Sequence, residues 1–408
     1  FVGIGYRDPG AVTENYFNGS LDEVQIQDCP QYMLVTSTAD TGIGSLRDAV
    51  ANVCSGGTIT FDSNLAGQTI ILASELVINK NLTIDGGTNA ITISGNGATR
   101  VFNVTSGEAT LAHLSIYRGK VAGASAQGGG IYVNVGAILH LQYVELRDNA
   151  ALGDDGTAAT LSGVAYGGGV YNAGTLSVQN STLRGNVAGG GSTYNEFDGN
   201  GGDGNGGGLY NAGTLALQNS TLYSNAAWGG DANRAEQNYG SDNGGNGAGG
   251  GVYNAGTLTV QNSTFSGNQG TGGWGGPSGG SAGQSIGGGL ANYNSATVQN
   301  TTFADNASLQ GVGIYNAGTW NLVNSLLVSQ TANPDCVNAG SPATTAKNNL
   351  SKTATCPGAT VTTTPRLGAL ADNGGGPKTH ALLIGSPALD AGDATTCASL
   401  PGGDLDQR

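Results

Sequence analysis

The sequence predicts an all-β fold: a right-handed parallel β-helix solenoid with an N-terminal capping helix and Gly-rich loop insertions. A unit of about 22 residues, GGG-[VL]-YNAGTL-x-[VL]-QNST-[LF] and its continuation, recurs along the chain. Its clearest copies begin at Gly167, Gly206 and Gly249, and weaker ones at Gly128, Gly287 and Gly311. Such repeats indicate a solenoid whose units bury their apolar faces only by stacking. Right-handedness is expected because parallel crossovers prefer that hand.

The period of the apolar residues identifies the type of solenoid. Leu258 and Val260 alternate with Thr257, Thr259 and Gln261, and a period of two is typical of a strand. Glycine-rich corners separate this strand from a shorter one beginning near the start of the repeat. A coil of this length matches one turn of a three-sided parallel β-helix. Equivalent residues of successive coils would then stack about 4.8 Å apart.

Asparagine and tyrosine recur at fixed positions of the repeat and should therefore form columns. Asparagine tolerates a left-handed corner, and stacked amides can hydrogen-bond to one another. We expect a structural ladder of inward-facing side chains in one column: Asn180, Asn219, Asn262, Asn300 and Asn324. Further Asn columns run through Asn172 and Asn186. We interpret the tyrosine column as a packing stack in preference to a ligand platform: Tyr132, Tyr171, Tyr210, Tyr253 and Tyr315.

Four consecutive coils carry an insertion at one point. Repeats begin 38 to 43 residues apart from Gly128 to Gly287, but Gly287 and Gly311 are only 24 apart. The surplus loops should form a ridge along one edge, which in solenoids is often the binding face. Their Gly, Asn, Asp and Ser content leaves their order open. Trp228 and Trp274 lie in them and are candidate contacts for sugar rings or a protein; the alternative is that each packs on its own loop.

The chain before the repeats divides into two parts. In residues 44–52, Ser45 is a candidate N-cap and Leu46, Ala49 and Val50 share one face, which predicts a helix that caps the solenoid. The expected organisation is a terminal strand or assembly strand at 1–29, a cap at 30–57, the β-helix at 58–330 and an irregular segment at 331–408.

Three segments resemble known proteins. YFNGSLDEVQIQD, residues 16–28, resembles the closing strand of a laminin-G-like, concanavalin-type domain. TADTGIGSLRDAV resembles the N-terminal cap of bacterial cell-surface right-handed β-helix proteins, a pectate-lyase-like solenoid family. The tail GALADNGGGPKTHALLIGSPALDAGD, residues 368–393, resembles the C-terminal segment of the same group, which has variable anchors. The resemblance covers about residues 33–408. It implies a secreted or surface-attached protein and does not specify a reaction.

Five cysteines suggest an oxidising compartment. Cys336 and Cys356 lie in one segment near the C-terminus, and we pair them. Cys29 and Cys54 flank the predicted cap helix and could staple it. Cys397 is then left over, and the family resemblance implies a partner for it beyond Arg408. Some of these cysteines could instead be free, buried thiols.

Composition narrows the range of partners. The formal net charge is −14, with one basic residue between Asn186 and Ala346. Nucleic acid and anionic membrane surfaces are therefore not expected as partners. No apolar run is long enough for a membrane span. The chain begins at Phe1 without a visible signal peptide, which suggests processing or a fragment.

Candidate chemistry is sparse. Calcium could be held by Asp198 and Asp203 in a Gly/Asn-rich loop, although solvated turn residues are the favoured interpretation. No carboxylate position repeats consistently in the strands, and no Ser-His-Asp arrangement is evident, so an enzyme is the minority interpretation.

These features predict an extracellular structural or adhesive surface protein, one form of which is a filament-forming subunit that assembles end to end as a homopolymer. The alternative is a protein that binds a cell-surface glycan or degrades a polysaccharide.

Overall fold

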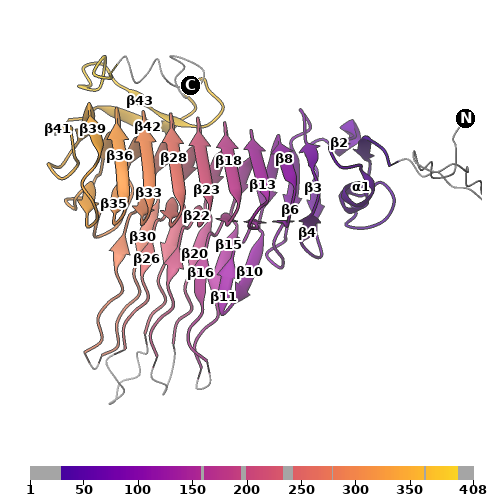
Figure 1. Cartoon of the computed structure of the whole chain (residues 1–408), viewed down its shortest axis with the longest axis horizontal. Coiled ribbons are helices and arrows are strands. Elements are labelled where there is room, and N and C mark those ends of the chain that lie inside the picture. Colours follow the sequence, from indigo (N-terminus) through magenta and orange to yellow (C-terminus); the bar gives the residue numbers. More distant parts are fainter. Residues whose placement is uncertain are drawn as a thin grey trace, which may run out of the picture.

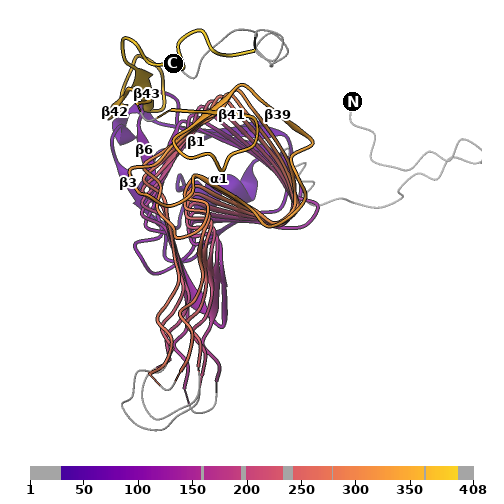
Figure 2. The same ribbon diagram turned by 90° about the vertical axis from the view of Figure 1, so that its left-hand side faces the viewer.

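The computed structural model describes residues 29–157, 160–193, 199–232, 242–277, 279–362 and 364–393. Three long parallel sheets enclose an elongated core, which confirms the predicted parallel β-helix (Figures 1 and 2). Each complete coil contributes one strand to each sheet in turn. None of the described helices is long and apolar enough to cross a membrane.

The three sheets differ in length but share one direction of stacking. The first sheet contains β1 (Tyr32–Val35), β2 (Gly57–Phe61), β5 (Leu82–Asp85), β8 (Glu108–Ala112), β13 (Ile138–Gln142), β18 (Thr175–Gln179), β23 (Thr214–Gln218), β28 (Thr257–Gln261), β33 (Ser295–Gln299), β36 (Thr319–Val323) and β39 (Thr345–Lys347). The second contains β3 (Thr69–Ile71), β6 (Ile91–Ser94), β9 (Leu114–Tyr117), β14 (Glu145–Arg147), β19 (Thr182–Arg184), β24 (Thr221–Tyr223), β29 (Thr264–Ser266), β34 (Thr302–Ala304), β37 (Leu326–Val328), β40 (Asn349–Ser351) and β41 (Ala359–Val361). The third contains β4 (Leu76–Ile78), β7 (Phe102–Val104), β12 (Ile131–Val133), β17 (Val170–Asn172), β22 (Leu209–Asn211), β27 (Val252–Asn254), β32 (Leu290–Asn292), β35 (Ile314–Asn316) and β38 (Cys336–Asn338).

The core is a continuous stack of apolar side chains between these sheets. Leu258 and Val260 of β28 point inward and are almost fully buried, while Thr257 and Gln261 face outward, as the period-two pattern predicts. Phe265 stacks on Phe303 of the next coil with ring centroids 4.7 Å apart. Side chains from each coil therefore bury those of the next.

The N-terminal end is closed by α1 (Leu46–Asn52), which confirms the predicted cap helix. The Ser45 hydroxyl accepts the backbone N–H of Asp48, and Leu46, Ala49 and Val50 are buried. A 3-10 helix, η1 (Ser63–Leu65), follows β2. The predicted Cys29–Cys54 disulfide is present beside the cap. Residues 1–28, including the laminin-G-like segment, lie outside the described residues.

The solenoid also extends further than the expected 58–330. β1 precedes that range, and β38 to β41 add strands after it that pair in parallel with the preceding coils. The Cys336–Cys356 disulfide joins this last part, as predicted. Cys397 lies outside the described residues. An antiparallel hairpin of β42 (Leu367–Ala371) and β43 (Thr379–Leu382) follows.

Two Asn columns form hydrogen-bonded ladders, one through Asn172 and one through Asn186. From Asn172 to Asn338, each Nδ2 donates to Oδ1 of the next coil at 2.6 to 2.7 Å. From Asn149 to Asn306 the corresponding bond is 2.9 Å, and the members are buried. The predicted ladder column instead occupies the corner after the first sheet with φ of 46° to 51°: Asn180, Asn219, Asn262, Asn300 and Asn324. These residues directly follow the last strand residue, which confirms the left-handed corner predicted for them, and their role as a ladder stays a prediction.

The described parts of the insertions form a fin that projects from one corner (Figures 1 and 2). Its outgoing sheet contains β10 (Lys120–Gly123), β15 (Ala150–Gly153), β20 (Val187–Gly189), β25 (Ala226–Trp228) and β30 (Gln269–Thr271). Its returning sheet contains β11 (Ser125–Gln127), β16 (Val164–Tyr166), β21 (Gly204–Asn205), β26 (Gly247–Ala248) and β31 (Ser285–Ile286). Five coils contribute, one more than the repeat spacing predicts, because residues 120–127 form a short first layer.

Candidate functional site

The fin is held together by backbone contacts between its two arms. The N–H of Gly202 on a returning arm donates to Gly191 O of an outgoing arm, and Gly230 then donates to Gly202 O, both at 2.8 Å. Gly245 continues the zigzag by donating to Gly230 O at 2.9 Å. A Cβ added at Gly229 on an outgoing arm would lie 1.8 Å from Gly245 O on the returning arm of the same coil. The arms therefore approach closely only because these positions lack side chains.

The two candidate tryptophans lie on the fin and expose large apolar surfaces. Trp228 ends β25 between Gly189 and Thr271 of the neighbouring strands and is 46% exposed. Trp274 follows β30 on the outgoing arm and is 67% exposed. Their exposure agrees better with a contact surface than with packing inside the loop. Their role in binding stays a prediction.

The aspartates in the insertions connect neighbouring coils. Asp203 Oδ1 accepts the N–H of Asn246 at 2.6 Å, and Asp231 Oδ1 accepts the N–H of Trp274 at 2.8 Å. Asp155 Oδ1 likewise accepts the N–H of Ser192 at 2.9 Å. Asp198, the second proposed calcium ligand, lies outside the described residues. Elsewhere in the described chain, no three His, Cys, Asp or Glu side chains are grouped as metal ligands would be.

The tyrosine column packs face to face along the third sheet. Tyr171 and Tyr210 have centroids 5.2 Å apart, and Tyr210 and Tyr253 are 4.9 Å apart. In the next coil Ala291 takes the expected position, and Tyr293 continues the stack instead. Burial raises the pKa of Tyr210 to about 12. Because each ring covers its neighbour, the column presents edges rather than faces, which supports the packing interpretation.

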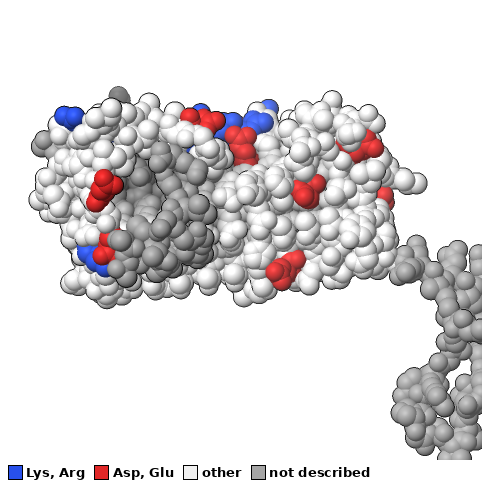
Figure 3. Space-filling model, turned by 90° about the horizontal axis from the view of Figure 1, so that it is seen from above, with Lys and Arg blue, Asp and Glu red and all other residues white. Residues whose placement is uncertain are grey.

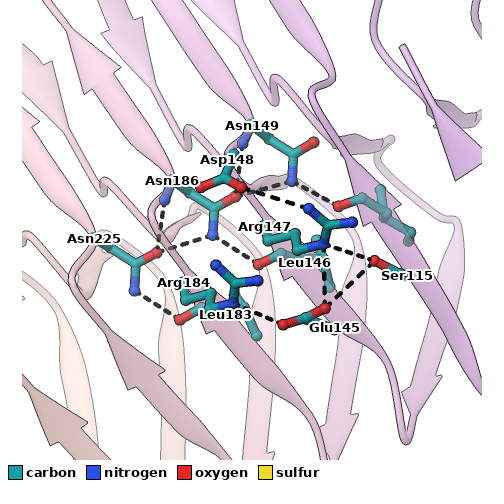
Figure 4. Close-up of polar contacts among 11 residues, drawn as sticks. Ser115, Glu145, Leu146, Arg147, Asp148, Asn149, Leu183, Arg184, Asn186 and Asn225 are labelled. Carbon is teal, nitrogen blue, oxygen red and sulfur yellow. Dashed lines mark hydrogen bonds and ion pairs between the residues drawn. The ribbon is translucent and has the colours of Figure 1, made fainter. Parts of the chain in front are cut away.

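A charged cluster lies on the outer face of the second sheet (Figure 4). Arg147 on β14 and Arg184 on β19 are register partners. Glu145 Oε1 accepts a hydrogen bond from Nε of Arg184 at 2.7 Å, and Glu145 Oε2 lies 3.3 Å from Nε of Arg147. Arg147 Nε also donates to Ser115 at 3.1 Å, while Asp148 lies 3.7 Å from Nη1 of Arg147. One carboxylate thus positions two guanidinium groups by their Nε edges.

Aromatic rings continue this row in both directions. Tyr117 is the register partner of Arg147, whose Cζ lies 3.8 Å from its ring centroid. Tyr223 is the partner of Arg184, and Lys378 Nζ lies 5.8 Å from its ring. Burial is the largest single influence on the pKa of Arg184 and lowers it, but the hydrogen bond to Glu145 and the nearby charges of Glu145, Tyr223 and Asp148 together raise the guanidinium pKa. Figure 3 shows one face of the molecule, on which a group of mixed sign and scattered acidic groups stand out from mostly uncharged described residues.

Sequence reasoning missed this cluster because net charge directed attention away from cations. An alignment of the repeats on Asn149 and Asn186 would have placed Arg147 and Arg184 at one position, two residues earlier. That repeat position was the available signal. The stacking of Tyr117 under Arg147 depends on side-chain direction and had no sequence signal.

The C-terminal hairpin folds back onto the second sheet. Lys378 O accepts the Thr221 hydroxyl at 2.6 Å, and His380 Nε2 lies 2.9 Å from Ser266 Oγ. His380 Nδ1 faces Gly368 O at 2.8 Å, so no carboxylate orients the imidazole, and Ser266 is only 7% exposed. This pair is suited to docking the hairpin rather than to nucleophilic catalysis.

A cavity of about 280 Å³ lies between the C-terminal segment and the Asn corner of the last coils. Its lining is mainly amide and hydroxyl groups and includes Asn262, Asn300, Thr302, Asn324, Thr379 and His380. Asn324 also exchanges hydrogen bonds with the backbone of Asp393, which ties the segment to this corner. The corner Asn column thus helps to seat the C-terminal segment.

No family model matches the chain, and no curated protein matches it. Among solved structures, the chain is similar to pectate lyase Pel9A, with 14% identity, a TM-score of 0.38, and coverage of 78% of this chain and 79% of that one. It is also similar to ORF18 of Geobacillus virus E2, with 11% identity, a TM-score of 0.30, and coverage of 78% and 61% respectively. Neither likeness bears on activity.

Proposed function

We propose that the chain is an extracellular structural or adhesive surface protein in which a rigid β-helix displays the fin for contact. The observation that carries this proposal is the fin itself. Five successive coils extend into it, and backbone groups and small residues occupy its interior, so it adds surface rather than an enclosed cavity. The two disulfides agree with an oxidising, extracellular setting.

The fin is suited to adhesion because backbone hydrogen bonds join its arms and because it exposes large apolar side chains. Trp228 and Trp274 expose 46% and 67% of their surface, and Leu161 exposes 84%. Exposed aromatic groups on ordered elements bind with little loss of conformational entropy. A surface glycan or a protein could be the partner of these side chains.

A fin-deletion variant tests the adhesive role. Residues 307–310 connect Asn306 to Gly311 without a long insertion, so this natural connector can replace residues 150–166, 187–205, 226–248 and 269–286. Beads coated with the variant should lose adhesion to glycan-coated or protein-coated surfaces to which wild-type beads adhere, while the melting transition of the solenoid persists. Equal adhesion by both kinds of bead would refute the role of the fin.

Assembly end to end is a finer form of the same proposal. Within the described residues, β1 pairs only with β2, and β38, β39 and β41 pair on one side only. Tyr32 and Leu34 on β1 are 79% and 50% exposed. Unpaired edges at both ends favour head-to-tail contact, which yields open polymers.

Electron microscopy of wild-type protein and of a chain lacking residues 1–28 tests this assembly. Fibres in the wild type that disappear on deletion would support it. Strictly monomeric wild-type protein at high concentration, or unchanged fibres after deletion, would contradict it. Polysaccharide degradation is the alternative function, and an assay for new chain ends would detect it.

A further inference from the structure

The row of cations and rings on the second sheet has free binding capacity. Glu145 engages the Nε edges of Arg147 and Arg184, and within the described residues neither Nη group of Arg184 meets a hydrogen-bond acceptor. Arg118 and Lys378 contact the rings of Tyr117 and Tyr223 rather than carboxylates. Guanidinium groups fixed at one edge are preorganised to bind an anion through the other.

The local charge is opposite to that of the chain. The row contains four cationic side chains, Arg118, Arg147, Arg184 and Lys378, against the carboxylates of Glu145 and Asp148. The full chain has a formal net charge of −14. A cationic strip within an acidic protein attracts anions at one place rather than over the whole surface.

We propose that this row, from Tyr117 through Arg147 and Arg184 to Tyr223, is a binding strip for an extended anionic polysaccharide. Its four members come from four successive coils in register, so the strip runs along the solenoid axis for about 14 Å. The two arginines bind acid groups of the polysaccharide, and Tyr117 and Tyr223 contact its sugar rings. This site is separate from the fin and does not depend on its role.

The spacing of the cations favours a polysaccharide over nucleic acid. Register-paired arginines on neighbouring strands lie about 4.8 Å apart at the backbone, a spacing that suits one acid group per sugar. Duplex DNA carries one charge per about 1.7 Å of helix axis, which the surrounding acidic surface would repel more strongly. Carboxylate and sulfate groups both match the guanidinium fork, and the test distinguishes them.

Binding of the full chain to immobilised polysaccharides tests the strip. The probes are alginate with carboxylates, dextran sulfate with sulfate esters, neutral dextran, and single-stranded DNA. We expect binding to at least one anionic polysaccharide, no binding to dextran, and weakening with added salt. The double substitution Arg147→Gln and Arg184→Gln should weaken binding at least about tenfold. Arg184→Lys, which keeps the charge but not the planar fork, should give an intermediate loss.

Lys352→Gln is the matched control because it removes one positive charge near the C-terminal end of the solenoid, where Lys352 contacts Ser329 O. It should leave affinity within about twofold. Melting curves establish that each variant is folded. Absence of binding to both anionic polysaccharides at low salt would overturn the proposal. Unchanged binding by the folded double variant, or tighter binding to single-stranded DNA, would overturn it as well.

Discussion

The solenoid and its fin stack the same coils by different means. In the solenoid, large side chains such as Phe265 and Phe303 fill the space between three sheets, and both are almost fully buried. In the fin, the two arms meet through glycine backbones, with alanines such as Ala151 and Ala188 nearer its base. Large apolar side chains therefore hold the coils of the solenoid together, whereas the arms of the fin pack closely because their glycines have no side chains.

One repeat can therefore encode both an interior of apolar side chains and an interior of packed backbone. Apolar burial stabilises roughly in proportion to the area removed from water, so the wide core contributes most of the stability. The thin fin buries little apolar area and relies on backbone hydrogen bonds, each worth about 1 kcal/mol net. Removing side-chain volume should therefore cost most stability in the solenoid, whereas adding side-chain volume should disturb the fin.

Truncating a core ring should have the largest effect. Phe265→Ala removes a side chain with 0% exposure and leaves a cavity against Phe303, which should cost about 3 to 5 kcal/mol of unfolding free energy. Denaturant unfolding measures this loss. Ala188→Gly in the fin is the comparison and should cost about 1 kcal/mol or less. Similar losses at both sites would show that the fin contributes as much stability as the core.

Breaking an amide ladder should come next. Asn225→Leu removes the acceptor of Asn186 and the donor to Asn268 and leaves buried polar groups without partners, at a cost of about 3 kcal/mol. Asn180→Gly at the corner should change stability by less than about 0.5 kcal/mol, because its φ of 50° suits glycine. Thermal unfolding compares the two variants. A larger loss at Asn180 would restore the ladder role predicted from the sequence.

Adding one methyl group inside the fin should act locally. Gly229→Ala would bring Cβ within 1.8 Å of Gly245 O on the opposite arm and force the arms apart, with faster hydrogen exchange in the fin. The global free energy of unfolding should fall by less than about 1 kcal/mol because the core is untouched. Gly189→Ala is the control, since its Cβ would meet only side-chain carbons, Leu152 Cδ2 at 3.3 Å. Unchanged exchange in Gly229→Ala would argue against close contact of the arms.

Raising the pH should have the smallest effect on stability, because it acts only above pH 10. Burial raises the pKa of Tyr210 and Tyr293 from 10.0 to about 12, so the folded state retains these protons more strongly than the unfolded state. Their contribution to stability is therefore complete below pH 10 and is lost as pH rises from 10 towards 12. Melting temperatures across this range, with Tyr210→Phe for comparison, measure it. An equally steep fall in the variant would assign the pH dependence to other groups.

The repeat period was enough to predict much of the fold. Alternation around Leu258 and Val260 determines which side chains face the core, and the apolar face of residues 44–52 predicts the cap. Proximity in the sequence led to the correct pairing of Cys336 with Cys356. These features depend on local pattern, which requires no knowledge of neighbouring coils.

The same pattern did not show where each strand ends. Asn262 continues the alternation of its strand, but the chain turns at this residue with a φ of 46°, and periodicity alone does not show where a strand ends. The ladders form at Asn172 and Asn186, where the backbone directs the amides along the stack.

The sequence by itself determined the stacking of coils, the point of insertion and the alternation of core residues, because these follow from composition and period. Only the tertiary structure decided that the described parts of the insertions pair into a fin, because glycines on opposite arms meet through space rather than along the chain. It also decided that Arg147 and Arg184 share Glu145, since their side-chain positions depend on the register of neighbouring coils.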